Sequence, residues 1–594
     1  MLNRFRRYLL SFVVILVAAC SADEGPAQSA VSNLSEADAQ FVADSVEYLE
    51  RLEKMGFAGG VQISRGDQTL LQAGYEFADR ESETPWSKNT VSTIGSITKQ
   101  FTGAAILLLQ EDGSLSVDDP ITNYFEGVPE NKQAITLHQL LTHSSGIVDL
   151  EGLSDWDPIG LDTYIKRVMA QPLEFEPGSS FAYSNTGYSL LAAIIEQISG
   201  VSYERFLQER LFLPAGMTDT GYIHVAWDDA RVAIGYQADE RWGTVLERPF
   251  DEDGPYWALR GNGGIHSTAA DMVTWAKALM SGSVMSKQSM DAYWAPHVDE
   301  GFGESFYSYG WVVTQGPGDR RMITHNGGNT IFFADMAIFP HDNVVIVLQT
   351  NVVSDWPLAN QLVEIISARL FEGEEFPLVP DRVDADADAI TAFVGNYVFG
   401  EGEQKLDYVV SAEGGELLVS SGNPLSFSYM HSTRDVDMER CGRLSNRIAE
   451  IVAAYVEKDD LEPLFEAYGG RAPLEALEQG WAVRKQREQE EFGALLGFSV
   501  LGTAMRNGRD VTLARHRFEN GHADTAFVWD PEEEENLLGR SGRGLDPVLR
   551  FVSTGESMFG SWDGGFSDSR TLRFDSDSLT LAGAAGDIVA VRGR

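Results

Sequence analysis

The sequence predicts an α+β fold in which helices pack on an antiparallel sheet. Two alternating apolar runs between residues 56 and 78 flank Arg65, Gly66 and Asp67, a pattern typical of a β-hairpin. Helical patterns follow the hairpin, and strand patterns then return at 308–315, 321–325, 331–339 and 344–350. An early hairpin and a late set of strands on either side of the helices indicate one antiparallel sheet that helices cover.

The expected helices differ in how much of their surface is apolar. Residues 38–54 have an amphipathic pattern, whereas Ser96 to Glu111 is apolar on almost every side and is followed by Gly113, which predicts a buried helix. Thr268 and Asp271 form a capping-box pattern at the start of a later helix. The remaining helices are expected at 135–142, 186–199, 202–211, 269–281 and 357–371.

The last part of the chain predicts a separate, smaller β-rich region. Residues 373–389 are acidic and contain prolines, which is typical of a linker. Residues 390–594 begin and end with short strand-like runs, but their middle has a helical pattern at 445–494 and a hairpin pattern at Asn520 and Gly521. We therefore expect an α+β insert at about 445–540.

Composition narrows the range of partners. Lys and Arg number 45 against 89 Asp and Glu, which gives a net charge of −44, so the chain should repel nucleic acid and anionic lipid surfaces. The sequence has no C-x-x-C, H-E-x-x-H or G-x-x-x-x-G-K-[ST] motif, and we expect neither a metal site nor a cofactor. The chain has two cysteines, Cys20 and Cys441. If Cys20 carries lipid, Cys441 is a free thiol that we expect to be buried.

The first residues predict export. Three arginines precede an apolar run at 8–19, which is shorter than the roughly 20 residues that span a membrane and fits a secretory signal. The run ends in VAAC, which resembles the lipobox of bacterial lipoproteins, so we expect a signal peptide at 1–19, lipid on Cys20 and a polar tether at 20–37. An ordinary signal peptide with a chance cysteine is the alternative. Because Ser21 follows the cysteine, we expect a periplasmic, outer-membrane lipoprotein that meets the membrane only through its anchor.

Lys99 lies three residues after Ser96, at the start of the apolar helix. Residues at i and i+3 share a helix face, so the Lys99 amine can reach the Ser96 hydroxyl. A serine needs a neighbouring base to act as a nucleophile, and burial lowers the pKa of a lysine from about 10.4 until the lysine can be that base. The Ser96 N–H would face a developing oxyanion. A chance serine beside a lysine that extends to water is the alternative.

Two later motifs contain further candidates for the same site. Tyr183 opens a Y-x-N motif with Asn185. The phenol can shuttle protons and the amide can bind a substrate carbonyl, while core packing and helix capping are the alternatives. His325 opens the run HNGG before an apolar strand, where Gly327 and Gly328 let a substrate approach closely. The N–H of Gly328 would be the second oxyanion donor.

These motifs lie in the blocks GSITKQFTGAAILLLQEDGSLSVDDPI, FEPGSSFAYSNTGYSLLAAIIEQISG and GNGGIHSTAADMVTWAKAL, which resemble the serine β-lactamase and penicillin-binding-protein superfamily, in its class C branch with related esterases and D-peptidases. The resemblance covers about residues 38–372. It implies Ser96 as nucleophile, Lys99 as its base partner and Tyr183 as general acid or base, with a structural role for His143. The region 390–594 resembles the lipocalin-like domain that often follows this catalytic domain, and its insert resembles a SnoaL-like cone fold.

His325 departs from the class C β-lactamase pattern, which has a lysine there, and within the family a histidine is typical of D-stereospecific peptidases. We therefore expect an exported serine hydrolase that forms an acyl-enzyme on amide or ester bonds of a small molecule or peptide, as a D-stereospecific peptidase, amidase or carboxylesterase. A β-lactamase and a non-catalytic penicillin-recognising or sensor lipoprotein are the alternatives. With a reference pKa of about 6.5, His325 should also gain charge towards pH 6 and then bind anionic substrates more strongly.

Overall fold

The computed structural model describes residues 34–594 except 151, 238–239, 302, 353–358, 360, 384–386, 403–404, 433–436, 470–473, 507–508, 532–535, 542–547, 556, 562–569, 576–577, 583–587 and 593–594. The expected signal peptide at 1–19, the lipidation site Cys20 and most of the tether lie outside the described residues.

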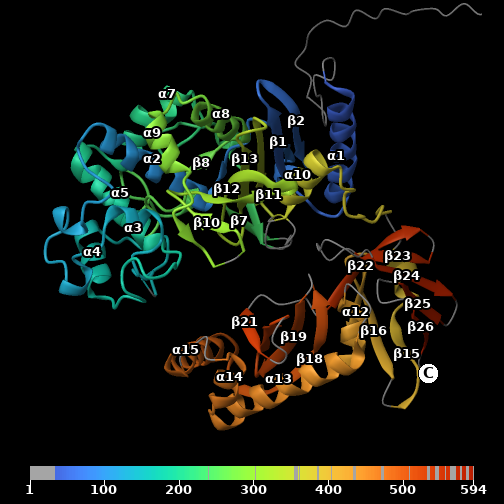
Figure 1. Cartoon of the computed structure of the whole chain (residues 1–594). Coiled ribbons are helices and arrows are strands. Elements are labelled where there is room, and N and C mark those ends of the chain that lie inside the picture. Colours follow the sequence, from blue (N-terminus) through green and yellow to red (C-terminus); the bar gives the residue numbers. More distant parts are fainter. Residues whose placement is uncertain are drawn as a thin grey trace, which may run out of the picture.

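An eight-stranded antiparallel sheet forms the centre of the first part of the chain (Figure 1). The early hairpin joins the late strands through pairing of Gly59 with Thr350, which confirms the predicted sheet. Arg65 and Gln68 close the hairpin, as expected. In spatial order the strands are β2 (Gln68–Tyr75), β1 (Gly59–Arg65), β14 (Val344–Thr350), β13 (Phe333–Phe339), β12 (Arg320–Gly328), β11 (Val312–Gly316), β10 (Ser305–Tyr307) and β9 (Val298–Asp299).

Helices cover both faces of this sheet. On one face, α1 (Glu36–Lys54) and α10 (Leu362–Glu372) enclose a core that includes Phe333 and Ala337 of β13. The alternate residues of the same strand, such as Met336, belong to the larger core on the opposite face, where most of the helices lie. Figure 1 shows α1 and α10 on one side of the sheet and the other helices of this part across it.

The expected buried helix is α2 (Thr98–Glu111), which is buried from Thr98 to Leu109 and is preceded by the 3₁₀ turn Gly95–Ile97. The expected helix at 202–211 is α6 (Tyr203–Leu207), which continues as a π-helical turn, Gln208–Phe212. The other helices are α3 (Leu137–Leu141), α4 (Leu161–Ala170), α5 (Asn185–Ser199), α7 (Leu213–Ala215), α8 (Ala269–Met280) and α9 (Lys287–Tyr293). Three strand pairs connect them: β3 (Phe77–Asp79) with β4 (Thr84–Pro85), β5 (Ser92–Thr93) with β8 (His266–Ser267), and β6 (Gly235–Gln237) with β7 (Glu240–Gly243).

The last part of the chain contains a closed eight-stranded antiparallel barrel, which confirms the β-rich C-terminal region. After α11 (Ala387–Thr391) its strands are β15 (Gly395–Phe399), β16 (Leu406–Glu413), β17 (Glu416–Ser421), β22 (Val548–Gly555), β23 (Met558–Ser561), β24 (Arg570–Asp575), β25 (Ser578–Ala582) and β26 (Ile588–Arg592).

The segment between β17 and β22 contains helices and a four-stranded sheet. These elements are α12 (Pro424–His431), α13 (Met438–Lys458), α14 (Glu462–Ala467), α15 (Leu474–Phe492), β18 (Leu495–Arg506), β19 (Arg509–Phe518), β20 (Gly521–Trp529) and β21 (Leu537–Ser541). The expected domain boundaries stay predictions.

The acidic segment after α10 contacts both parts of the chain. Asp381 pairs with Lys54 at the end of α1, at 3.2 Å, and Arg382 pairs with Glu416 of the barrel, at 3.3 Å. The Val383 N–H also donates to the Ser553 carbonyl at 2.8 Å.

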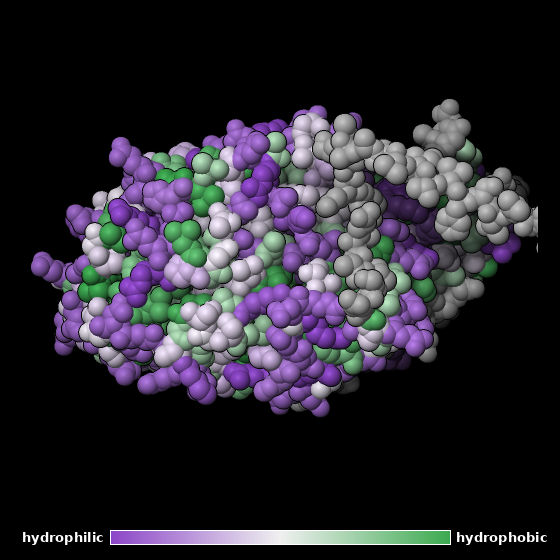
Figure 2. Space-filling view, turned by 90° about the horizontal axis from the view of Figure 1, so that it is seen from above, coloured by the Kyte–Doolittle hydropathy of each residue, from purple (hydrophilic) through white to green (hydrophobic). Residues whose placement is uncertain are grey.

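Hydrophilic residues cover most of the face seen in Figure 2, with smaller hydrophobic areas between them. In the part of the chain that the structure describes, no helix combines the length and apolar character needed to cross a membrane. Cys441 is a buried free thiol, as predicted, and burial raises its pKa to about 11.

Asp335 is an acidic side chain in the sheet core between β13 and the helices α1 and α10. It is 7% exposed and alternates with the apolar residues of that core. Burial raises its pKa from 3.8 to about 7. In the folded protein the carboxyl therefore keeps its proton below about pH 7, while the unfolded chain releases it near pH 4. The free energy of unfolding must then fall as pH rises across this interval.

We expect Asp335→Asn to stabilise the protein at pH 8, by roughly 1–4 kcal/mol, because the variant avoids ionisation of this group on burial. The difference should shrink to about zero at pH 4. Chemical denaturation at both pH values measures it, with Asp299→Asn on the exposed edge strand β9 as the control. An Asp335→Asn effect that is the same at both pH values would contradict this account.

Candidate active site

Ser96 lies where the helical layer meets strand β12. It belongs to the 3₁₀ turn before α2, and Gly95 has a φ of +51°, which glycine adopts without strain. A Cβ on Gly95 would lie 2.4 Å from the Gly328 nitrogen, and a Cβ on Gly327 would lie 2.3 Å from the Ser96 nitrogen. Only glycines allow the two backbones to come this close, and the contact places the two expected oxyanion donors beside each other.

Lys99 is fully buried and its amine has three neighbours. The Nζ atom lies 2.8 Å from Oδ1 of Asn185, 2.7 Å from the backbone oxygen of Asn262 and 3.1 Å from Oγ of Ser96. The two carbonyl oxygens can only accept hydrogen bonds, so two N–H groups of the amine donate to them. The position that remains faces Ser96. In the neutral amine this position holds the lone pair, which can accept the hydroxyl proton.

The electrostatic surroundings favour the neutral form of Lys99. Burial lowers its pKa from 10.5 to about 7, while the negative charges of Asp149 and Asp155 act in the opposite direction. Near neutral pH a substantial fraction of the amine is therefore able to accept a proton.

Asn185 is oriented by a carboxylate. It is the first residue of α5, and the cap of this helix is Ser184, whose hydroxyl accepts the Gly187 N–H. Asp149 accepts the Asn185 amide NH₂ at 3.1 Å and the Thr186 N–H at 2.8 Å. Because the NH₂ points to Asp149, the amide oxygen points to Lys99.

Tyr183 lies over Lys99, with the amine 4.8 Å from the ring centroid. The nearest aromatic ring is that of His143, at 4.2 Å between centroids. Although Tyr183 is 41% exposed, withdrawal of its hydroxyl from water raises the pKa of the phenol, and a hydrogen bond with Ser96 acts in the opposite direction. The phenol therefore keeps its proton at neutral pH and is a proton donor there rather than the resting base.

His325 does not titrate as expected. Its Nδ1 lies 2.6 Å from the Asn326 carbonyl, which can only accept, so this nitrogen carries the proton. Its Nε2, 3.0 Å from the Tyr307 hydroxyl, then accepts a hydrogen bond. Burial and the nearby Lys99 lower the pKa of His325 to about 3. The expectation that His325 gains charge towards pH 6 is therefore wrong, because it neglected burial.

Two cavities meet at Ser96. The larger has a volume of about 500 Å³, and its lining includes Tyr183, His325 and Glu300. Burial raises the pKa of Glu300, which accepts a hydrogen bond from Ser305. The smaller has a volume of about 80 Å³ and is lined by Thr93, Gly95, Ser96, Asp155, Trp156, Asn185, Val245, Leu259, Asn262, Gly263, Gly264, Gly328 and Asn329.

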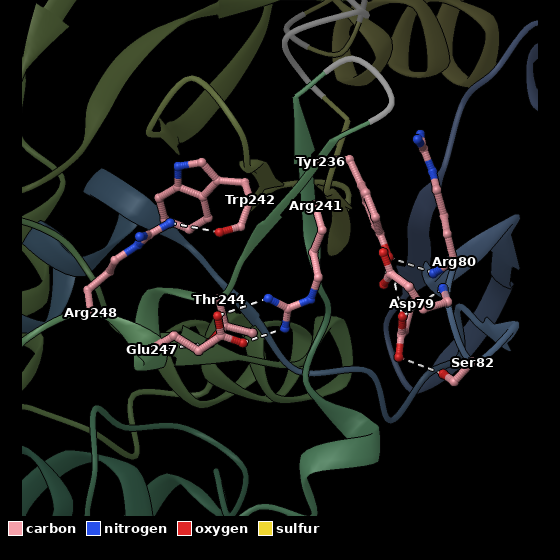
Figure 3. Close-up of polar contacts among 10 residues, drawn as sticks. Asp79, Arg80, Ser82, Tyr236, Arg241, Trp242, Thr244, Glu247 and Arg248 are labelled. Atoms are coloured by element: carbon pink, nitrogen blue, oxygen red, sulfur yellow. Dashed lines mark hydrogen bonds and ion pairs between the residues drawn. The ribbon is translucent and has the colours of Figure 1, made fainter.

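The wall of the smaller cavity is supported by the hairpin of β6 and β7. The Trp156 ring lies 6.5 Å from that of Trp242 on β7, between centroids. The Arg248 guanidinium stacks on the Trp242 ring, 3.9 Å from the ring centroid, and donates a hydrogen bond to the Trp242 carbonyl at 2.7 Å. Figure 3 shows this pair beside the double hydrogen bond between Arg241 and Glu247, which closes the same turn.

The structure thus brings together all the residues predicted for the site, namely Ser96, Lys99, Tyr183, Asn185, His325, Gly327 and Gly328. Their roles stay predictions. Sequence reasoning missed Asp149, Asp155, Asn262 and Glu300. Asn262 acts through its backbone oxygen, which has no side-chain signature, and the three acids belong to no recognisable spacing. Among the described residues, no group of three or more His, Cys, Asp or Glu side chains is arranged to hold a metal ion.

Comparison with known proteins assigns the family. The family model described as Beta-lactamase matches residues 48–366, more than half of the chain. Penicillin-binding protein 4* of Bacillus subtilis is 28% identical over 369 residues, which cover 59% of this chain and 81% of that protein.

Among solved structures, the octameric penicillin-binding protein homologue from Pyrococcus abyssi has a TM-score of 0.51 at 18% identity and covers 92% of this chain and 99% of its own. D-amino acid amidase from Ochrobactrum anthropi has a TM-score of 0.47 at 24% identity and covers 56% and 99%. The match to the family model over most of the first part of the chain shows that this protein belongs to the β-lactamase family and is a serine hydrolase of the penicillin-binding-protein and β-lactamase superfamily.

Proposed function

We propose that this enzyme hydrolyses amide or ester bonds through an acyl-enzyme on Ser96, with Lys99 as the base. The observation that supports this most directly is the geometry of the Lys99 amine. Two carbonyl oxygens accept hydrogen bonds from two of its N–H groups. The third position on the nitrogen faces the Ser96 hydroxyl, whose oxygen lies 3.1 Å away. A non-catalytic sensor would not require a buried lysine with its pKa lowered to about 7.

The proposed reaction has two halves. Neutral Lys99 accepts the Ser96 proton while Oγ bonds to the substrate carbonyl carbon, and the oxyanion lies beside the N–H groups of Ser96 and Gly328. The carbon–leaving-group bond then breaks, the Tyr183 hydroxyl donates a proton to the departing nitrogen or oxygen, and Lys99 returns a proton to Tyr183. In the second half water attacks the carbonyl carbon of the acyl ester and loses a proton to the same pair of residues. The carbon–Oγ bond then breaks, the pair returns this proton to Oγ of Ser96, and the acid leaves.

The larger cavity favours a peptidase, amidase or carboxylesterase over a β-lactamase, and the D-stereospecific preference rests on His325, which is typical of D-stereospecific peptidases of the family. β-Lactam antibiotics have a carboxylate near the reacting bond. The residues that line this cavity include no lysine or arginine, its histidine is neutral, and burial raises the pKa of its one acidic residue, Glu300. An anionic substrate group therefore has no cation to bind there, whereas a neutral amide or ester needs none.

We also propose that the protein is an outer-membrane lipoprotein anchored through Cys20. The support is the VAAC sequence after the basic and apolar leader.

Ser96 should be the residue that a fluorophosphonate labels, because it is the serine beside a neutral amine. We expect one adduct, found by peptide mass mapping, and a loss of ester hydrolysis on the order of 10³-fold or more in Ser96→Ala. Ser179→Ala, in the exposed turn before Tyr183, is the control and should keep full activity. Labelling of another serine would show that the nucleophile has been misassigned.

The pH dependence should come from Lys99. For a neutral ester we expect kcat/KM to rise with pH, with a midpoint near 7, because the amine becomes a base as it loses its proton. Lys99→Arg should lower kcat/KM about 10²-fold or more, since the guanidinium stays charged. His325→Gln should keep the midpoint near 7, whatever its rate, because the native imidazole is already neutral there. A midpoint that disappears in His325→Gln would assign the titration to the histidine instead.

Cys20→Ala should prevent processing or release a soluble protein. Fractionation of cells that express the full chain, with metabolic labelling by a palmitate analogue, measures this, and Cys441→Ala is the control. Unchanged membrane association and labelling in Cys20→Ala would disprove the anchor.

A further inference from the structure

His143 follows helix α3 in a backbone conformation that usually belongs to glycine. Its φ is +56°. The His143 N–H donates to the Leu140 carbonyl at 3.4 Å, and the Ser144 N–H donates to the Gln139 carbonyl at 2.9 Å. These two bonds form a Schellman motif, in which the residue with positive φ is most often glycine. A histidine at this position carries backbone strain that glycine avoids, and such strain persists where other contacts of the residue offset it.

The contacts of His143 hold Tyr183 on three sides. The His143 carbonyl accepts the Ala182 N–H at 3.0 Å, and its Nδ1 atom accepts the Ser184 N–H at 3.0 Å. Its ring lies 4.2 Å from the Tyr183 ring, between centroids, with 35° between the ring planes. One residue therefore fixes the backbone before the tyrosine, the backbone after it and one side of the phenol ring.

The imidazole of His143 is placed to support the site rather than to react. A backbone N–H can only donate, so Nδ1 is the acceptor and Nε2 carries the proton. Burial and the nearby charge of Lys99 lower the pKa of His143 well below 6.5, so the ring stays neutral in this tautomer near pH 7. His143 is 1% exposed and does not belong to the lining of either cavity beside Ser96. The rings of Tyr307 and Tyr188 pack against it at 4.4 and 5.1 Å between centroids, which holds the imidazole in place.

The orientation of Tyr183 matters for one step of the proposed reaction and not for the other. The Lys99 amine has its hydrogen bonds with three residues, none of which is His143. Attack by Ser96 therefore does not require His143. Transfer of a proton from Tyr183 to the leaving group does require the phenol to point at the departing atom.

We propose that His143 is a positioning residue that aims the Tyr183 hydroxyl at the leaving group during acylation. This role rests on the proposed acyl-enzyme function and adds to it a residue that touches neither the substrate nor Ser96. Without the imidazole the Tyr183 ring can tilt, and its hydroxyl then leaves the line of proton transfer, while neutral Lys99 still accepts the Ser96 proton. Loss of His143 should therefore slow only substrates whose leaving group needs a proton.

The test compares two esters of the same acid that differ in their leaving group. p-Nitrophenolate departs without a proton, whereas the alkoxide of an ethyl ester must be protonated as it leaves. We expect His143→Gly, which suits the positive φ, to lower kcat/KM for the ethyl ester about 10- to 100-fold and to leave that for the p-nitrophenyl ester within about threefold. The comparison uses kcat/KM because this quantity reports acylation and excludes the later hydrolysis of the acyl-enzyme.

Two further variants separate positioning from a general effect on the fold. His143→Asn also fits a positive φ, and its amide oxygen can replace Nδ1 as the acceptor of the Ser184 N–H, so it should recover part of the ethyl-ester activity. His138→Asn is the matched control, because His138 belongs to the same helix but its Nδ1 atom lies 2.9 Å from the Tyr309 hydroxyl. His138→Asn should leave the ratio of the two ester activities unchanged.

A double-mutant cycle shows whether His143 acts through Tyr183. Tyr183→Phe lacks the proton donor and should change the ratio of the two activities at least as much as His143→Gly does. His143→Gly added to Tyr183→Phe should then change the ratio no further. Labelling of Ser96 by a fluorophosphonate should keep its native rate in His143→Gly, because fluoride departs without a proton.

Equal losses for the two esters in His143→Gly, or a labelling rate that falls as much as the ethyl-ester activity, would overturn the proposal. A ratio that changes in Tyr183→Phe but not in His143→Gly would remove the positioning role and keep the proposed function. A ratio that is unchanged in Tyr183→Phe would show that the proton donor of the proposed function is misassigned, and His143 would then have no donor to position.

Discussion

The burial of one lysine amine is the constraint on which the rest of the site depends. Lys99 has no access to water, so every hydrogen bond of its amine must come from the protein. Two of the partners lie far away in the sequence, on the first turn of α5 and in the loop that contains Asn262. That loop is itself held by the buried Arg260, which pairs with Glu196 and Asp253. The chemistry at Ser96 therefore requires three separate segments to converge on a single nitrogen atom.

The fold achieves this convergence by packing α2 between the sheet and the other helices. Its apolar surface is buried from Thr98 to Leu109, which fixes the helix in rotation and along its axis. The backbone contact between Gly95 and Gly328 then sets the distance between the helix start and strand β12. Side chains larger than a hydrogen atom would separate the two segments, so this contact makes the alignment of the two oxyanion donors a property of the backbone.

The two cavities beside Ser96 differ in size and in electrostatic character. The larger includes a neutral histidine and a carboxylic acid with a raised pKa, and it borders the phenol of Tyr183. The smaller includes the carboxylate of Asp155 and the indole of Trp156, whose neighbour Trp242 is held by Arg248. Neither lining includes a lysine or an arginine, and the nearby Lys99 amine is close to losing its charge at neutral pH. The site as a whole therefore suits neutral and cationic groups better than anionic ones.

Local features of the sequence predicted much of this protein because they depend on neighbours along the chain. The hairpin around Gly66, the apolar helix after Ser96 and the reach from Ser96 to Lys99 follow from periodicities of two and about 3.6 residues. Three properties depended on the tertiary structure. Neutral His325 results from burial against Lys99 and Tyr307, the carbonyl of Asn262 has no side-chain signal, and Asp155 reaches the cavity through a loop that has no motif. Titration and cavity lining are set by atoms that are close in space but distant in sequence, and only the folded chain brings those atoms together.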